Sequence, residues 1–346
     1  MRIAVDANGA DLGPAEVAAG AAIAAKRGVT PVLFGPADQI GEVPEGVEVV
    51  DAPVSIAKAP EPVSAVRSTP ESSIVRAAQA VASGDCEALV AGGTTGAALA
   101  AGLFNIKRAR GIYRPALAVP LPVPGNPVTL VDVGANVECR PEHLVQFAHM
   151  GAALAQVVLG LERPRVGLLN NGEERSKGTP LLVEAHALLA ASPGLDFVGN
   201  IEGNHVVDGA ADVVVTDGFT GNVTIKLIEG VSQMMIGAIR ERAESSPRAK
   251  AGGLLMRPAL RRFRDEIDPE GPGGAYLLGL RRLGVVPHGR FTRYGISQAI
   301  LLAARGTSGD VVGRTHAALE AAGALKSAPA AIRPGHPAPA SDARRG

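Results

Sequence analysis

Short apolar runs alternate with longer amphipathic stretches along most of the chain. Nine apolar runs, rich in Val, Leu, Ile and Ala, predict buried strands at residues 3–5, 31–34, 47–50, 88–91, 117–121, 129–133, 166–169, 197–198 and 213–215. Six stretches with apolar residues at helical spacing predict helices at 15–26, 72–83, 96–107, 142–159, 181–191 and 222–243. Strands that are apolar on both faces and separated by helices are typical of a mostly parallel sheet. The pattern therefore predicts a doubly wound α/β fold with helices on both faces of the sheet.

The pattern changes near residue 245 and again near residue 327. Residues 248–264 contain six basic residues and no acidic one, and they predict a basic helical hairpin at 245–270 that projects from the sheet domain. Residues 327–346 are rich in Pro and Ala and lack periodicity, which predicts a disordered tail. No internal repeat is visible, and we expect residues 1–326 to form a single α/β domain.

The composition argues against several classes of protein. Lys plus Arg and Asp plus Glu each number 34, and aromatic residues make up 3% of the chain, so neither charge nor stacking favours nucleic-acid binding. Two cysteines provide neither a disulfide framework nor a zinc ligand set. The first residues read as a strand rather than a signal peptide, and no run of about 18 apolar residues occurs. We therefore expect a cytoplasmic protein that needs no metal or cofactor.

Residues 211–223 form the most informative stretch. They read as a buried strand, a tight turn at 217–222 and then a long helix. In an open α/β sheet, ligands bind beyond the carboxyl ends of the strands. Glycines let backbone N–H groups approach an anion, and a helix N-terminus favours negative charge. The turn supplies Asp217, Gly218, Thr220, Gly221 and Asn222 as candidate anion-binding residues, and a purely structural strand–turn–helix joint is the alternative.

Other predicted strands also end in polar or glycine-rich sequence. The candidate residues at these ends are Asp6, Gly93, Thr94, Thr95, Gly96, Asn136, Asn170 and Lys177. We expect them to share one rim of the sheet with the turn at 217–222. The glycines at 93 and 96 do not have the spacing of a dinucleotide fingerprint, and each turn alone has a structural reading. Together the residues suit anion binding and electrostatic stabilisation rather than covalent catalysis.

Cys139 and His143 are four residues apart and offer an alternative, a thiol nucleophile with a base. Pro141 is well placed to begin a helix between them. The stronger interpretation is that Cys139 lies in a loop and His143 in a helix, with no third residue to orient the histidine.

Over residues 1–320, in collinear order, the chain resembles the bacterial phosphate acyltransferase (PlsX) family. The matching segments include Asp-Val-Gly-Ala-Asn-Val at 132–137, Phe-Val-Gly-Asn at 197–200, the stretch at 211–223 and His-Gly at 288–289. The resemblance implies a phosphotransacetylase-like and isopropylmalate-dehydrogenase-like α/β fold with a projecting helical hairpin, and a homodimer. It also implies transfer of a fatty acyl group from acyl-[acyl carrier protein] to inorganic phosphate, giving acyl-phosphate for phospholipid synthesis.

The resemblance carries over two catalytic roles. Lys177 matches the family's proposed catalytic lysine and Asn222 its proposed catalytic asparagine. Phosphate is itself a nucleophile, so the expected task of the protein is to hold two anionic partners together and to stabilise an oxyanion.

The basic hairpin has two expected partners, an anionic membrane surface at the inner face of the cell membrane or the acidic carrier protein. The residues expected at this surface are Leu254, Leu255, Met256, Arg257, Arg261 and Arg262. A solvated, dimer-packing hairpin is the alternative.

Two loops depart from the family pattern. Ala-Asn-Gly-Ala-Asp-Leu at 7–12 stands where the family has Ala-Met-Gly-Gly-Asp-His, and Thr94 replaces an asparagine. The nearest rival is a phosphotransacetylase-like enzyme that uses acyl-CoA, with the same chemistry and a different carrier. The changed loops also leave room for a non-catalytic, membrane-associated scaffold of lipid synthesis. A nicotinamide dehydrogenase of similar fold is disfavoured, because no dinucleotide fingerprint is present.

Overall fold

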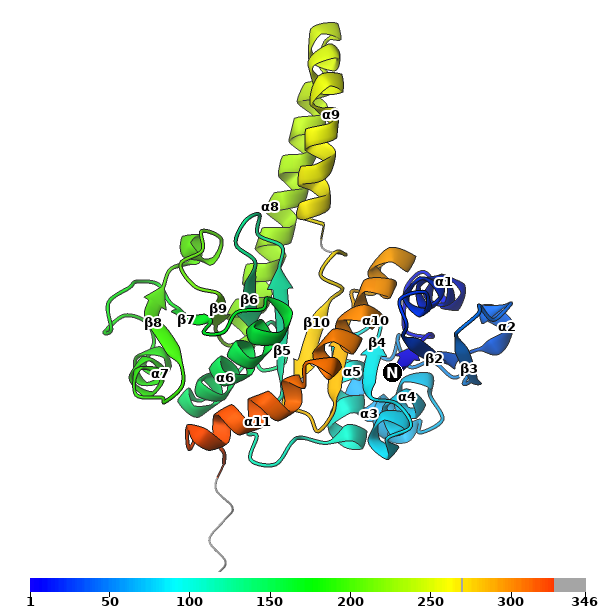
Figure 1. Ribbon diagram of the computed structural model, residues 1–346, viewed down its shortest axis with the longest axis horizontal. Coiled ribbons are helices and arrows are strands. Elements are labelled where there is room, and N and C mark those ends of the chain that lie inside the picture. The colour runs from blue at the N-terminus through cyan, green and yellow to red at the C-terminus, as the bar shows by residue number, and fades with distance from the viewer. Residues whose placement is uncertain (269, 327–346) are drawn as a thin grey trace, which may run out of the picture.

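The computed structural model describes residues 1–268 and 270–326, and a continuous eleven-stranded sheet runs through this part of the chain (Figure 1). Its strands are β1 (Arg2–Asp6), β2 (Thr30–Gly35), β3 (Glu48–Asp51), β4 (Ala88–Ala91), β5 (Ala116–Leu121), β6 (Val128–Val131), β7 (Arg165–Leu169), β8 (Asp196–Ile201), β9 (Val213–Val215), β10 (Ala275–Leu278) and β11 (Leu283–Val286). All nine predicted strands are present. The two C-terminal strands, β10 and β11, are additions that the hydrophobic pattern did not indicate. The predicted tail at 327–346 lies outside the described residues.

The strand order is β3-β2-β1-β4-β11-β10-β5-β6-β9-β7-β8. Seven of the ten pairings are parallel, which confirms a mostly parallel sheet. The three antiparallel pairings, β11 with β10, β10 with β5 and β5 with β6, lie together at the centre. Three successive reversals make the strands from β6 to β8 run opposite to those from β3 to β11. The sheet thus contains two parallel halves of opposite direction, one from β3 to β11 and one from β6 to β8, with β10 and β5 between them.

Helices cover both faces of the sheet, as predicted. Packed against one face are α1 (Pro14–Ala25), α6 (Pro141–Val158), α7 (Pro180–Ala190), α10 (Arg293–Ser308) and α11 (Val311–Ala321). Packed against the other are α3 (Pro62–Ser68), α4 (Ser73–Ser83), α5 (Thr95–Ala101) and the π-helix η1 (Gly102–Ile106). The short helices α2 (Ala37–Ile40) and η2 (Gly203–Val206) follow β2 and β8. Alternate residues of each strand enter the two cores, as Val5 and Ala4 do in β1.

A long helical hairpin projects from the sheet domain (Figure 1). It is formed by the distal part of α8 (Gly218–Glu244) and by α9 (Pro247–Glu266). The predicted segment at 245–270 is therefore only the second arm, and the first arm continues the helix that starts at the end of β9. Ser246 lies in the turn at the far end and caps α9, its side chain accepting a hydrogen bond from the Ala249 N–H at 3.1 Å.

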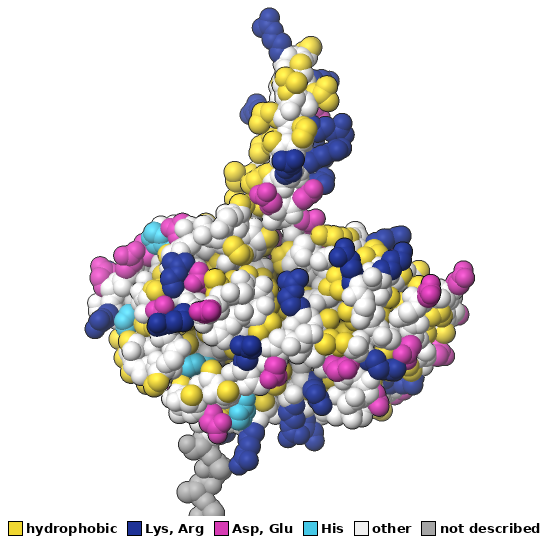
Figure 2. Space-filling view, in the orientation of Figure 1, with side chains coloured by type: hydrophobic (Ala, Val, Ile, Leu, Met, Phe, Trp, Pro, Cys, Tyr) yellow, Lys and Arg dark blue, Asp and Glu magenta, His cyan; other side chains and the backbone are white. Residues whose placement is uncertain are grey.

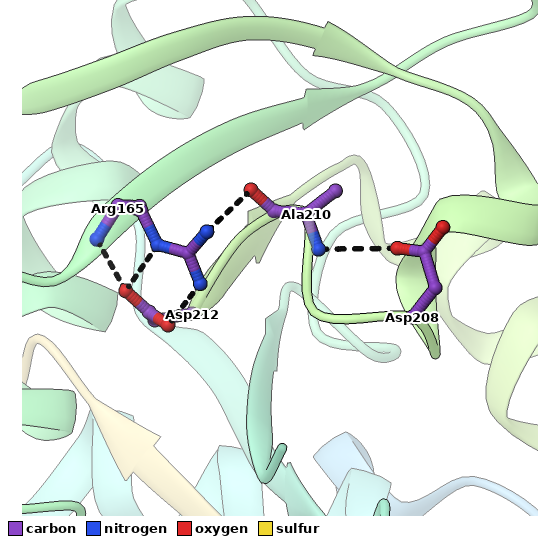
Figure 3. Close-up of polar contacts among 4 residues, drawn as sticks. All are labelled: Arg165, Asp208, Ala210 and Asp212. Atoms are coloured by element: carbon purple, nitrogen blue, oxygen red, sulfur yellow. Dashed lines mark hydrogen bonds and ion pairs between the residues drawn. The ribbon is translucent and has the colours of Figure 1, made fainter.

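An ion pair ties the start of β7 to the start of β9. The Arg165 guanidinium donates two hydrogen bonds to the Asp212 carboxylate, at 2.8 and 3.1 Å, and the Arg165 main-chain N–H adds a third at 2.7 Å. The guanidinium also reaches the Ala210 carbonyl, while the Ala210 N–H donates to Asp208 (Figure 3). These bonds fix the segment that leads into β9, and so the position of the strand from which α8 starts.

Candidate functional site

A buried carboxylate organises the loop that follows β6. The Asp132 side chain is fully buried and accepts five hydrogen bonds, from the main-chain N–H groups of residues 117, 134, 135 and 136 and from the Asn136 side-chain amide, at 2.8 to 3.2 Å. Burial raises the pKa of Asp132, and the N–H donors oppose that shift. Asn136 also donates to the Pro115 carbonyl at 2.7 Å. Both amide hydrogens of Asn136 are thus used to hold the loop.

The first turn of α8 presses directly on this loop. The helix begins at Gly218, four residues earlier than predicted, so most of the expected turn at 217–222 is helical. A Cβ at Gly221 would lie 1.8 Å from the Asp132 carbonyl oxygen, and one at Gly218 would lie 2.6 Å from that of Asn136. Both positions therefore require glycine for close packing, which is the structural reading of this stretch.

Asp217 caps α8. Its carboxylate accepts hydrogen bonds from the Thr220 main-chain N–H at 2.9 Å and from the Thr220 hydroxyl at 2.8 Å. The Gly218 N–H donates to the Asn136 carbonyl at 2.7 Å. Two of the N–H groups that the sequence suggested for anion binding are therefore engaged by the protein itself.

Asn222 follows one turn into α8 and faces the same loop. Its amide nitrogen donates to the Val133 carbonyl at 3.2 Å, which leaves its second amide hydrogen for another acceptor. A Cβ at Gly134 would lie 3.1 Å from this nitrogen, so the glycine leaves room for the amide. The Asn222 side chain is held at the carboxyl ends of β6 and β9.

Lys177 lies in the loop after β7, the strand next to β9 in the sheet. Its side chain is about half exposed, with the ammonium 3.9 Å from the Glu174 carboxylate. Asn170, at the start of the loop, donates to the Lys177 carbonyl at 3.1 Å and accepts from the Asn171 N–H at 2.8 Å. The cation and the Asn222 amide thus come from adjacent parallel strands of one half of the sheet.

The remaining predicted residues lie in the other half. Asp6, at the end of β1, is buried and accepts hydrogen bonds from the Ser73 hydroxyl at 2.6 Å and the Asn8 N–H at 3.1 Å. Burial raises its pKa to about 6. Gly93 has a φ of +102°, and a Cβ there would lie 2.5 Å from the Gly9 carbonyl oxygen. Thr94 caps α5, its hydroxyl accepting from the Ala97 N–H at 3.4 Å.

The expectation that all the polar strand ends share one rim is wrong. Followed along the strand pairings, the carboxyl ends of β1 and β4 lie at the opposite edge of the sheet from those of β6, β9 and β7, because the two halves run in opposite directions. Helix α8 lies near residues of both halves of the sheet. Asn222 contacts the loop after β6, whereas Lys226 and Glu229, together with Asp11 of the first half, lie close enough to His288 to affect its pKa, which burial lowers.

Cys139 and His143 do not form a nucleophile–base pair. The Cys139 thiol donates to the Asn136 carbonyl at 3.7 Å, and burial together with Asp132 and Asp217 raises the pKa of Cys139 to about 12. His143 accepts from the Arg140 N–H at 3.2 Å at the start of α6. A thiol that remains protonated at neutral pH is a poor nucleophile. Asp132 was not among the predicted site residues, although an acidic residue near the end of a buried apolar run, two residues before a glycine, was a usable signal.

The fold is that of the phosphotransacetylases. The chain is similar to a phosphotransacetylase from Streptococcus pyogenes, with a TM-score of 0.60 and 15% identity over 89% of this chain and 94% of that one. It is also similar to a branched-chain phosphotransacylase from Enterococcus faecalis, with a TM-score of 0.57 and 16% identity over 89% and 99% of the two chains. At this level of identity the likeness establishes the α/β fold alone.

The sequence comparisons establish the family. The family described as "Fatty acid synthesis protein" matches residues 1–314, and the chain belongs to it. A phosphate acyltransferase from a Synechococcus strain is 43% identical over 92% of this chain and 86% of its own length. Those from Synechococcus elongatus and Thermobifida fusca are 44% and 50% identical, over 60% and 56% of this chain, and the chain spans 61% and 54% of their lengths.

Proposed function

We propose that this protein is a phosphate acyltransferase, which transfers a fatty acyl group from acyl-[acyl carrier protein] to inorganic phosphate. The observation that carries the proposal is the family match over residues 1–314, with a phosphate acyltransferase similar over 92% of the chain. The site supports it, because Lys177 and Asn222 supply a cation and an amide donor from adjacent strands without a protein nucleophile.

In the proposed reaction, a phosphate oxygen attacks the thioester carbonyl carbon of the acylated pantetheine arm. The C–O bond forms, the C–S bond breaks and the thiolate leaves, so that acyl-phosphate and the free carrier are the products. Lys177 neutralises phosphate charge, and the second amide hydrogen of Asn222 donates to the oxyanion that develops on the carbonyl. A fixed amide that is already bonded to Val133 needs little reorganisation during the reaction.

The other residues of the site are proposed to bind and position the substrates. Near Asn222 these are Asn136, Asn170, Asp217, Gly218, Thr220 and Gly221. Asp6, Gly93, Thr94, Thr95 and Gly96 form the second group. Thr94, Thr95 and Gly96 are exposed at the start of α5, and we propose that they contact the pantetheine arm. The side chains of Asp6, Asn136, Asn170 and Asp217 are hydrogen-bonded within the protein, so these four residues act by fixing the shape of the loops that bind the substrates.

The rival enzyme is one that uses acyl-CoA, as a phosphotransacetylase fold allows. Acyl-phosphate formation should therefore be measured with acyl-[acyl carrier protein] and with acyl-CoA of the same acyl chain length, side by side. The proposal predicts the higher kcat/KM with the carrier protein. A preference for acyl-CoA would support the rival, and no acyl-phosphate from either donor would support the non-catalytic scaffold.

A homodimer is proposed from an exposed apolar stripe on α8. The stripe follows helical spacing and consists of Phe219, Val223, Leu227, Val231, Met234, Met235 and Ile239, all at least 40% exposed. Contiguous exposed apolar surfaces are characteristic of association sites. Since the stripe begins three residues before Asn222, a second copy seated on it would also border the site. Sedimentation equilibrium, with Leu227→Glu as the disruptive variant, tests this dimer.

Peripheral contact with an anionic membrane, at the inner face of the cell membrane, is proposed for the hairpin. Leu254, Leu255 and Met256 are each more than half exposed, and Arg257, Arg261 and Arg262 are exposed on the same helix. Figure 2 shows apolar and basic side chains together along the projecting hairpin. Among the described residues, no helix combines the length and apolarity needed to cross a bilayer. Docking of the acidic carrier protein on this surface is the alternative.

A further inference from the structure

Two buried asparagines hold the main chain of Lys177 from both sides. Asn170, after β7, donates its amide to the Lys177 carbonyl at 3.1 Å. The Lys177 N–H donates to the Glu174 carbonyl at 3.0 Å, and that same oxygen accepts the side-chain amide of Asn200 at 2.9 Å. Both main-chain polar groups of Lys177 are thus fixed, one directly and one through a shared carbonyl.

The orientation of the Asn200 amide is set by a third buried residue. His186, on α7, lies with its Nδ1 2.9 Å from the Asn200 Oδ1. If Nδ1 carries the proton it donates to Oδ1, which directs the Asn200 nitrogen to Glu174. The ring packs edge-on against Phe197, with centroids 5.1 Å apart. Asn170, Asn200 and His186 are 8%, 6% and 7% exposed, so their mutual bonds are shielded from water.

The loop also leaves space for the lysine side chain itself. A Cβ at Gly172 would lie 2.8 Å from the Lys177 Cγ and 3.1 Å from its Cδ. The lysine stem therefore crosses directly over Gly172. The asparagines hold the main chain of Lys177, whereas its side chain, about half exposed as a whole, can present the ammonium group to an anion.

We propose that Asn200, oriented by His186, is a positioning residue for Lys177 in the acyl-transfer reaction. The inference rests on the proposed catalytic role of Lys177. Burying two asparagines and a histidine around one loop is costly unless every polar group is paired. Here the two asparagine amides bind the carbonyls of Lys177 and Glu174, and the Glu174 carbonyl also accepts the Lys177 N–H. The rate of the reaction depends on the position of the Lys177 cation relative to phosphate and the developing oxyanion, since small displacements of a catalytic group lower the rate by large factors. Holding the Lys177 main chain in place is therefore expected to favour catalysis.

The test is a double-mutant cycle on kcat and KM. Asn200→Ala is expected to lower kcat about 10- to 10²-fold, with KM for the acyl carrier little changed, and Lys177→Ala to lower it about 10²–10³-fold. If Asn200 acts through Lys177, Asn200→Ala adds no further loss to Lys177→Ala. Asn171→Ala, an exposed asparagine in the same loop, is the matched control and should retain the wild-type rate.

A second measurement follows the loop independently of activity. Amide hydrogen exchange in a peptide covering residues 171–179 should be about tenfold faster in Asn200→Ala, since one fixing hydrogen bond is lost. If Asn200→Ala does not fold, Asn200→Asp is measured instead. The aspartate side chain has the same shape and keeps the oxygen that accepts from His186, but it lacks the amide that donates to the Glu174 carbonyl.

The outcomes separate the two proposals. A Lys177→Ala variant with the wild-type rate overturns the catalytic role of the lysine. If Lys177→Ala does lose activity, three results would each overturn the positioning role alone. These are a wild-type kcat in Asn200→Ala, multiplicative losses in the double variant, and unchanged hydrogen exchange at residues 171–179.

Discussion

The Asp132 carboxylate and the Asn136 side-chain amide are joined at 2.8 Å in the loop after β6, and the same carboxylate oxygen accepts the Asn136 main-chain N–H at 2.8 Å. One buried acceptor thereby fixes both the backbone and the side chain of its neighbour. Because the Asn136 carbonyl in turn receives the Gly218 N–H at 2.7 Å, this relationship sets where α8 begins and where Asn222 points.

Asp132→Ala is expected to destabilise the protein by about 3 kcal/mol or more, because it leaves several buried N–H donors without an acceptor. Urea unfolding of the variant and of the wild type measures this difference. Asp38→Ala, which removes an exposed carboxylate on α2, is the control and should change stability by no more than about 0.5 kcal/mol. Equal stability of the two variants would contradict the organising role of Asp132.

Helix α8 contains one glycine in close contact with a neighbouring loop and another with open space around it, and these two give a second, paired prediction. Gly221→Ala should destabilise by about 1–3 kcal/mol, since its Cβ would meet the Asp132 carbonyl oxygen at 1.8 Å. Gly230→Ala on the same helix has open space around it and should stabilise by about 0.5–1 kcal/mol, the usual gain of alanine over glycine within a helix. Thermal unfolding of both variants checks the opposite signs. A neutral Gly221→Ala would show that α8 does not need this close approach.

Asp6 predicts a stability that falls with rising pH. Burial raises its pKa from 3.8 to about 6, so between these values the folded state binds more protons than the unfolded chain. The stability due to protonated Asp6 is present below about pH 4 and is lost as the pH rises through about 6, amounting to about 3 kcal/mol at most.

Asp6→Asn removes this dependence, because the amide carbonyl still accepts from Ser73 and Asn8 but carries no charge. The variant should therefore be more stable than the wild type at pH 8, with the difference shrinking towards pH 4, as measured by denaturant unfolding at both values. A variant that is no more stable than the wild type at pH 8 would contradict the effect of burial on the Asp6 carboxylate.

The hairpin surface predicts membrane binding that depends on apolar side chains. A Leu254→Glu/Leu255→Glu variant should lose sedimentation with phosphatidylglycerol vesicles, because two exposed apolar groups become acidic. Val43→Glu, an exposed valine on the body of the molecule, is the matched control and should still bind. Unchanged binding by the leucine variant would remove this part of α9 as the contact. Unaltered turnover with the carrier protein in that variant would also separate membrane contact from carrier docking.

Most of the fold could be predicted from the sequence, because its strands are short apolar runs bounded by turn residues. The exceptions share a physical cause. Strand β10 reads Ala-Tyr-Leu-Leu and β11 reads Leu-Gly-Val-Val, so neither shows alternation of apolar and polar residues, and their neighbours across the sheet, such as Ala118 opposite Tyr276, decide their conformation. The relative direction of the two halves could not be predicted either. The sequence of a parallel half with helical connections has the same pattern whether the other half runs in the same direction or in the opposite one.

The site could be predicted only in part, for a related reason. Polar residues at strand ends were identifiable, and the sequence indicated both Lys177 and Asn222 through resemblance. Packing decides which polar groups form hydrogen bonds within the protein and which stay free for a ligand. Asp217 binds Thr220, Asn136 binds Asp132, and Asn170 binds Lys177. The glycines of the 217–222 stretch read equally well as anion-binding or as packing residues, and only the contact with Asp132 separates these roles.

The central claim is that Lys177 and Asn222 act together on phosphate and a thioester without a protein nucleophile. The most direct measurement is the rate of acyl-phosphate formation from acyl-[acyl carrier protein] and inorganic phosphate by the wild type, Lys177→Ala and Asn222→Ala, with circular dichroism used to verify that each variant is folded. We predict that the wild type forms acyl-phosphate and that each folded variant is about 10²–10³-fold slower. Folded variants that both retain near wild-type rates would contradict the account.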